Sequence, residues 1–207
     1  MFPRRPDAVA SDPPATPVAN QASFRVVPLF ELQFPPEQIE ALASRFPAVD
    51  DARGRAAGAA ARARGHYTRG EFIEVCRWKT PRSAPRVAAN KPRAVVEMTG
   101  RAFASTDEGL RIEALLELAG VGVPTASTLL FFAFPDEYPI LDVRALESLG
   151  VKPRSQYPIS FWLAYLATCR DLAARHGVNI RTLDKALWQH SKERAALATT
   201  SAGSLRR

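Results

Sequence analysis

The chain has 207 residues, of which 46% are hydrophobic, enough to bury a sizeable core in one domain or in two lobes that share a core. It carries 28 Lys and Arg against 21 Asp and Glu, and this formal net charge of +7 favours contact with a polyanion, the alternative being that it only aids solubility. Its two cysteines, Cys76 and Cys169, are far apart and lack partners at metal-binding spacing, which excludes a disulfide framework, a zinc ribbon and an iron–sulfur cluster.

The ends of the chain differ in composition from its middle. Residues 1–23 contain five prolines and little that can pack, so we expect them to be disordered. Residues 24–198 are expected to form one helical domain, and residues 199–207 a flexible basic tail that ends in Arg206-Arg207. No run of about 18 apolar residues predicts a membrane span. Arg4 and Arg5 are not followed by the apolar segment of an export signal, so a cytoplasmic location is expected.

Prolines and capping residues mark the helix starts predicted in the first two thirds of the chain. These starts lie at Pro35-Pro36, Asp50-Asp51, Thr68, Asn90, Ser105 and Pro124. Thr68 with Glu71, and Ser105 with Glu108, have the spacing of a capping box, in which each residue bonds the other's backbone amide.

The last third of the chain is also predicted to be helical. Three helices are expected there: one from Asp142 to Gly150, one with an apolar seam over Trp162–Ala173 that Gly177 ends, and one capped by Thr182. Phe24–Phe34 has the composition of an extended segment, but no second strand is available to pair with it. The sequence therefore predicts an all-α protein of about eight to ten helices with short connections.

The segment Leu118-Ala119-Gly120-Val121-Gly122-Val123-Pro124-Thr125-Ala126 is the most informative motif. One helix ends at Leu118 and another begins near Val123, with two glycines that permit positive φ and a close approach to the backbone. The first amides of the second helix have no intrahelical partner and attract an anion such as a nucleic-acid phosphate. The alternative is a tight turn between two helices with no ligand. A dinucleotide-binding loop is disfavoured because no strand precedes the glycines.

This segment resembles the helix-hairpin-helix (HhH-GPD) superfamily of DNA glycosylases, which includes endonuclease III, the adenine glycosylase MutY and the 8-oxoguanine glycosylases. Tyr138-Pro139-Ile140-Leu141-Asp142-Val143-Arg144 is similar to the family's P-V-D-T-H-V turn, and Asp142 follows Gly120 by 22 positions, close to the family spacing. The resemblance covers about residues 110–150, with the hairpin at 110–134. It implies an all-α, helix-hairpin-helix DNA glycosylase-like fold, with two helical lobes and a cleft between them.

Asp142 stands where the family keeps its essential carboxylate. Cleavage of an N-glycosidic bond builds positive charge on the sugar, which a nearby carboxylate stabilises while it orients or activates water. The target base must also leave the stack. The alternative role of Asp142 is that of N-cap for the helix that follows, and the two roles are compatible.

Two positions depart from the family pattern. Pro124 occupies the place of the lysine that lyase members use, and because proline cannot form an imine, the resemblance implies a monofunctional glycosylase. Arg144 stands where many members have histidine, and phosphate contact is the role expected of it. The resemblance implies no cofactor other than an optional monovalent cation at the hairpin.

A second resemblance lies at Glu74-Val75-Cys76-Arg77-Trp78-Lys79-Thr80, which is similar to the E-V-M-L-Q-Q-T helix of the adenine glycosylases. Glu74, in the place of the family's proton donor, shares a helix face with Trp78, so an acid and an aromatic platform together predict a base pocket, with Lys79 beside them. The alternative is a solvated glutamate and a core tryptophan. Arg82, in the loop that follows, is either a DNA contact or a solvated side chain.

Three functions stay open at this point. The first is a DNA base-excision glycosylase. It is expected to act on duplex DNA as a monomer, in the cytoplasm and in association with the nucleoid. The second is a non-catalytic helix-hairpin-helix DNA-binding protein, and the third is a helical interaction protein with no nucleic-acid role. For the first, the candidate residues are Asp142 and Glu74 for catalysis, Trp78 and Lys79 for the base pocket, and Leu118, Gly120, Val121, Gly122, Val123, Thr125, Arg82 and Arg144 for DNA.

Overall fold

The computed structural model describes residues 29–204, with side chains through residue 198, and over this range the chain contains ten α-helices and no strand. The expected disordered segment 1–23 lies outside the described residues. The α-helices are α1 (Ile39–Ser44), α2 (Ala52–Arg64), α3 (Arg69–Lys79), α4 (Ala84–Ala88), α5 (Pro92–Ala104), α6 (Glu108–Leu116), α7 (Val123–Ala133), α8 (Val143–Ser148), α9 (Ile159–Arg175) and α10 (Ile180–Ser204). Short 3₁₀ turns, Pro36–Gln38 and Pro81–Ser83, precede α1 and α4.

Several helix boundaries confirm the sequence prediction. Thr68 and Glu71 form a complete capping box at the start of α3. Asp142 is the N-cap of α8. Gly65 and Gly177, with φ of +86° and +65°, follow α2 and α9, because a helix ends readily where a residue without a side chain turns left-handed.

Two predicted caps are wrong, and in both cases a nearby side chain takes the cap. Asp107 caps α6 by accepting the Leu110 amide at 2.8 Å, while the Ser105 hydroxyl accepts the Asp107 amide. Asn179, rather than Thr182, caps α10, accepting the Thr182 amide at 2.7 Å. In each case the spacing rule identified the right turn of chain but the wrong residue, since several polar side chains compete there.

The segment before α1 does not form a strand within the described residues. Glu31 and Gln33 instead donate their backbone amides to the carbonyls of Leu149 and Ser148 at 3.0 and 2.9 Å, at the C-terminal end of α8. At the other end of the chain, α10 continues to Ser204, so residues 199–204 are helical where the sequence suggested a tail.

Helix α7 is the centre of the core. All of its residues except Pro124 are buried, and the Tyr67 hydroxyl, from the loop before α3, donates to the Leu129 carbonyl in its middle at 2.8 Å. Helix α2 lies directly on α7 because it offers Gly58 at the contact, where a Cβ atom would come within 2.0 Å of the Phe132 carbonyl oxygen. A helix that is apolar on all sides, as α7 is, must be surrounded by others.

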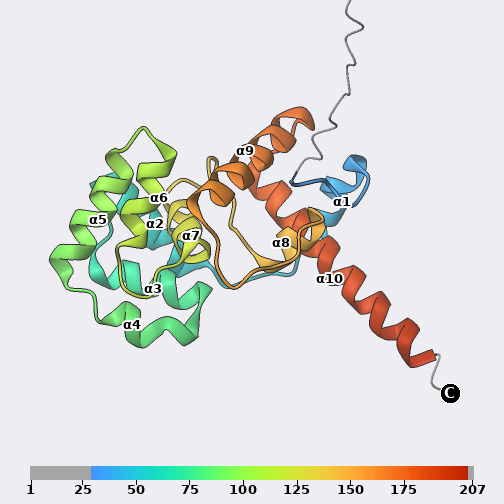
Figure 1. Ribbon diagram of the computed structural model, residues 1–207, viewed down its shortest axis with the longest axis horizontal. Coiled ribbons are helices and arrows are strands. Elements are labelled where there is room, and N and C mark those ends of the chain that lie inside the picture. Colours follow the sequence, from blue (N-terminus) through green and yellow to red (C-terminus); the bar gives the residue numbers. More distant parts are fainter. Residues whose placement is uncertain (1–28, 205–207) are drawn as a thin grey trace, which may run out of the picture.

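The other helices lie around α7 in two sets. Helices α2, α3, α5, α6 and α7 contact one another, α1 and α8 pack on α10, and α9 contacts both α6 and α10 (Figure 1). Beyond these contacts α10 extends away from the other helices towards the C-terminus (Figure 1). Within the described residues, no helix is long and apolar enough to cross a membrane.

Candidate functional site between α3 and α8

Asp142 lies at the start of α8 with both carboxylate oxygens engaged. Its Oδ1 accepts the Arg144 amide at 2.9 Å, which is the N-cap bond, and its Oδ2 accepts the Lys79 ammonium at 3.0 Å. The Asp142 side chain is 30% exposed, so the carboxylate still faces open space. The cap fixes the orientation of the carboxylate, and the helix dipole of α8 favours its negative charge.

Lys79 reaches Asp142 from the last residue of α3. Its side chain is 12% exposed, and its hydrogen bond to Asp142 joins two helices that are far apart in the sequence. The neighbouring Trp78 donates its indole N–H to the Asp50 carbonyl at 3.0 Å and packs edge-on against Phe132. The end of α3 is therefore held in place by the core.

A small cavity of about 210 Å³ lies behind the Lys79–Asp142 pair. Its lining is largely aromatic and aliphatic, with two carboxyl and two cationic side chains among them: Phe46, Val49, Trp78, Lys79, Ile140, Asp142, Ala145, Arg181, Asp184 and Trp188. It is smaller than the 300–1,000 Å³ typical of drug-sized ligand sites, and so suits a ligand smaller than these.

Asp184, on α10, is the member of this site that sequence reasoning missed. It is buried, its Oδ1 accepts the Ile140 amide at 3.3 Å, and its Oδ2 accepts from Arg181 at 2.7 Å. Burial raises the pKa of its carboxyl to about 6, although the positive charges of Arg181 and Lys79 act in the opposite direction. Asp184 is four residues before the inward-facing Trp188, so a carboxyl on the apolar face of this helix was a signal available in the sequence.

A larger and more open cleft of about 770 Å³ lies on the other side of the same pair. Trp78, Lys79 and Asp142 line both the cleft and the small cavity. Gly122 and Val123 of the hairpin turn also line this cleft. The structure thus brings Asp142 and the hairpin, separated in sequence, to one cleft.

The hairpin turn presents backbone rather than side chains. The side chains of Leu118, Val121, Val123 and Thr125 are buried, whereas Gly122 is exposed. The Val121 and Thr125 amides bond to carbonyls within the turn, but those of Gly122 and Val123 have no partner among the described residues. Gly120 likewise has no hydrogen-bond partner for its amide among the described residues, so three of the predicted contact residues leave an amide for an anion, and Gly122 is the exposed one.

The two glycines of the hairpin have different roles. Gly120 has φ of +79°, and a Cβ there would lie 3.0 Å from Val87 N, so it allows the turn to pack on α4. Gly122 is the N-cap of α7 with φ of −107°, and a Cβ there would meet only Pro124 Cδ at 3.9 Å. The expectation of positive φ therefore applies to Gly120 alone.

Asn90 holds the hairpin turn from outside it. Its buried amide donates to the Ala119 carbonyl and accepts the Ala119 amide, both at 2.9 Å, and donates to the Val87 carbonyl at 2.9 Å. The N-cap of α5 is Lys91, not Asn90, and it makes no side-chain cap. The prediction that Asn90 starts this helix is therefore wrong by one residue, and its bonds to the hairpin are a role that spacing does not reveal.

The other predicted site residues are not equally placed. Arg82 is exposed and lines the open cleft. Arg144 lies over the Trp188 ring, 5.2 Å from its centroid, and lines neither the cleft nor the small cavity. Glu74 also lines neither of them, and its side chain makes no hydrogen bond or ion pair within the described part of the chain. The structure brings Trp78 and Lys79 to Asp142 but leaves Glu74 outside.

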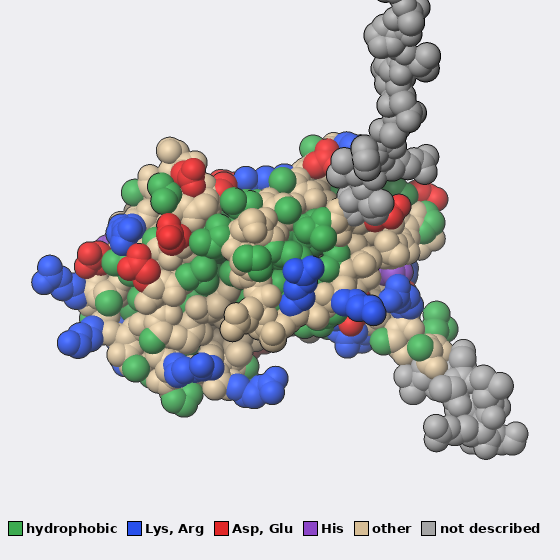
Figure 2. All heavy atoms as spheres, in the orientation of Figure 1, with side chains coloured by type: hydrophobic (Ala, Val, Ile, Leu, Met, Phe, Trp, Pro, Cys, Tyr) green, Lys and Arg blue, Asp and Glu red, His purple; other side chains and the backbone are tan. Residues whose placement is uncertain are grey.

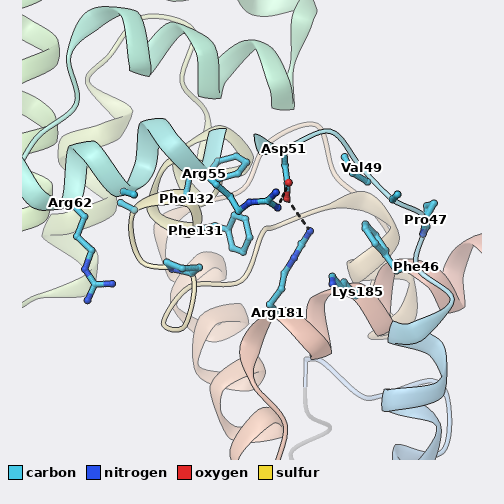
Figure 3. Close-up of a pocket in the computed structure, with 14 residues that line it drawn as sticks. Phe46, Pro47, Val49, Asp51, Arg55, Arg62, Phe131, Phe132, Arg181 and Lys185 are labelled. Carbon is cyan, nitrogen blue, oxygen red and sulfur yellow. Dashed lines mark ion pairs between the residues drawn. The ribbon is translucent and has the colours of Figure 1, made fainter. Parts of the chain in front are cut away.

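A third cavity, of about 600 Å³, adjoins the small one and shares Phe46, Val49 and Arg181 with it. Arg181 is stacked between the rings of Phe46 and Phe131, at 5.4 and 4.9 Å from their centroids. Figure 3 shows Arg55 and Arg181 both pointing toward Asp51, which neutralises part of their charge. Arg181 also bonds Asp184, so it separates this cavity from the site around Asp142.

Basic side chains also lie around these openings at the surface. Arg154 faces the open cleft from the loop before α9, opposite Arg82. In the view of Figure 2, Lys and Arg side chains lie over α4, near the α8–α10 end and at the α5 end, apolar side chains gather in the middle of the face, and Asp and Glu lie at the α5–α6 end. Within residues 29–198, no group of three or more His, Cys, Asp or Glu side chains is arranged to hold a metal ion.

Comparison with known proteins identifies no relative. No protein-family model, no curated protein and no solved structure matches this chain.

Proposed function

We propose that this protein is a DNA base-excision glycosylase, which hydrolyses the N-glycosidic bond of a damaged or modified base in duplex DNA. The observation that carries the proposal is the cleft that joins the hairpin turn to Asp142. A carboxylate held in a fixed orientation and an anion-attracting backbone both line it.

In this proposal the hairpin binds the DNA backbone. The unpartnered amides of Gly122 and Val123 donate to a phosphate at the N-terminus of α7, and exposed Gly122 offers no side chain to obstruct it. Arg82 and Arg154 add positive charge along the cleft. The two sets of helices that meet at the cleft fit a two-lobed, helix-hairpin-helix glycosylase-like fold.

The same geometry suits chemistry at the sugar. With the hairpin on a phosphate, Asp142 faces the sugar of an extruded nucleotide, where its charge stabilises the cation that forms as the base departs. The extruded base enters the small cavity between Trp78 and Trp188. Because Glu74 is outside this cavity, Asp184 is the group we assign to protonate the departing base. The pKa of its carboxyl, raised by burial, is suited to proton transfer near pH 6.

The test is base release from a panel of duplexes, each with one lesion, detected by mass spectrometry of the free base. The wild-type protein should release one or more bases, and Asp142→Asn should lower the rate at least about 100-fold, since it removes the charge but keeps a good N-cap. Asp107→Asn is the matched control, because Asp107 caps α6 in the same way and lines neither the cleft nor the small cavity.

The outcomes separate the alternatives. Full activity in Asp142→Asn on a substrate that the wild type cleaves contradicts the assignment of Asp142. Salt-dependent DNA binding without release of any base favours a non-catalytic helix-hairpin-helix protein. Absence of DNA binding favours a helical interaction protein with no nucleic-acid role.

A further inference from the structure

Lys79 is placed to do more than neutralise Asp142. Among the described residues it is the only lysine that lines the open cleft or the small cavity, and it lines both. Its ammonium is 3.0 Å from the carboxylate that the proposed function places at the sugar. A primary amine beside a sugar carbon is the arrangement that imine formation requires.

We propose that Lys79 is the nucleophile of an abasic-site lyase activity, which rests on the proposed function but acts on a different substrate, DNA that has already lost a base. Pro124 removes the amine from the hairpin, and α3 supplies one to the same cleft. The chain therefore combines a hairpin without lysine with an amine at the carboxylate.

The reaction balances without any further reagent. The Lys79 ammonium gives a proton to Asp142, and the free amine attacks C1′ of the ring-opened aldehyde to form a carbinolamine. Asp142 returns its proton to the carbinolamine hydroxyl, which leaves as water, and the protonated imine that results acidifies the C2′ hydrogen. The Asp142 carboxylate accepts that proton as the C3′–O bond breaks and the 3′ phosphate departs with the electron pair. Water then hydrolyses the imine and returns the free amine.

The surroundings of Lys79 distinguish it from an ordinary surface ion pair. Its side chain is 12% exposed, and on the cleft side its neighbours include the apolar side chains of Trp78 and Leu116. Partial removal from water restrains the ammonium, so the pair with Asp142 holds the nitrogen at one place in the cleft. A sugar bound between the Lys79 amine and the Asp142 carboxylate would then contact both groups.

The experiment is reductive trapping. The full chain is mixed with an oligonucleotide duplex that carries one aldehydic abasic site, sodium borohydride is added, and adducts are measured by intact mass and peptide mapping. We expect a one-to-one covalent adduct at Lys79 and at least a tenfold lower yield in Lys79→Arg, which keeps the charge opposite Asp142 but cannot form the imine. Lys152→Gln is the matched control, because Lys152 is exposed and lines no part of the cleft.

The folding of Lys79→Arg is checked by its thermal transition, and duplex binding by fluorescence anisotropy. If Lys79→Arg traps as well as the wild type, or if a protein that binds the duplex gives no adduct, the lyase inference is wrong. Base release from the lesion panel decides the glycosylase proposal separately. If the wild type does not bind the abasic duplex at all, both are wrong.

Discussion

The two carboxyl groups of the site have contrasting surroundings. Asp142 is partly exposed, caps α8 and is paired with Lys79. Asp184 is buried, and burial raises the pKa of its carboxyl to about 6. A partly exposed, ion-paired carboxylate beside a buried carboxyl with a raised pKa is a basis for assigning different roles to the two groups.

The raised pKa of Asp184 predicts a pH-dependent stability. Between about pH 4 and pH 6 the unfolded chain has lost this proton while the folded chain still binds it, so the free energy of unfolding falls as pH rises through that window and then levels off. We expect the wild type to lose up to about 3 kcal/mol relative to Asp184→Asn across this range. Urea unfolding of both proteins at pH 4.5, 5.5 and 7.0 measures the difference.

Asn cannot titrate, so any change in the ion pair with Arg181 shifts the Asp184→Asn values by a constant amount. A difference between the two proteins that does not vary with pH would contradict the raised pKa. The direction matters, because an ordinary ion-paired aspartate would give the opposite slope, with stability lost on acidification.

At the scale of elements, the hairpin turn combines two requirements that its two glycines meet separately. Gly120 is needed for folding of the turn, because its backbone is left-handed and its close packing disfavours a side chain. Gly122 keeps the backbone amide accessible to a ligand, and neither its φ nor its open surroundings require a glycine for folding. Substitution of each glycine by alanine should therefore affect different measurements.

Gly120→Ala should lower the free energy of unfolding by at least about 1–2 kcal/mol, because alanine is strained at φ of +79° and its Cβ would lie 3.0 Å from Arg86 Cβ and Val87 N.

Gly122→Ala should leave the free energy of unfolding within about 0.5 kcal/mol of the wild-type value, because only Pro124 Cδ, at 3.9 Å, is near. If the Gly122 amide binds phosphate, the added methyl should still weaken DNA binding several-fold. Urea unfolding and fluorescence anisotropy separate the two effects, and a stability loss in Gly122→Ala with unchanged affinity would contradict this division.

The sequence predicted elements well where one local rule decides them. The capping box at Thr68, the N-cap at Asp142 and the start of α7 near Val123 depend on neighbours within one turn, and the structure confirms all three. The caps of α6 and α10 were misassigned because several polar residues within one turn compete for the same amides.

Contacts between distant segments were predicted less well. Three hydrogen bonds could not be predicted from local sequence patterns, because each depends on how separate helices pack. They join Lys79 to Asp142, Asn90 to Ala119 and the Ile140 amide to Asp184. Glu74 and Trp78 both lie on α3, but only Trp78 reaches the cavity, because tertiary packing decides which part of the helix faces it.

At the scale of the whole molecule, the net charge of +7 is informative only through its distribution. Arg82 and Arg154 lie at the open cleft, whereas Arg45, Arg101 and Arg175 are paired with Glu193, Glu117 and Asp171 elsewhere. Charges that are paired on the surface contribute little to binding a distant polyanion. The basic residues at the cleft are therefore the ones that a DNA complex should engage.

This distribution predicts how DNA binding responds to salt. The logarithm of the dissociation constant should rise linearly with the logarithm of the salt concentration, because each phosphate contact releases counterions.

Arg82→Gln should weaken binding to all sequences alike and reduce that slope by about 1, because Arg82 is exposed at the cleft and is expected to contact one phosphate. Arg175→Gln, which removes an equally exposed arginine paired with Asp171, should leave the slope unchanged. Anisotropy titrations of a 20-base-pair duplex between 50 and 200 mM salt measure all three proteins. A wild-type slope near zero, or equal slopes for wild type and Arg82→Gln, would show that the cleft does not bind the DNA backbone.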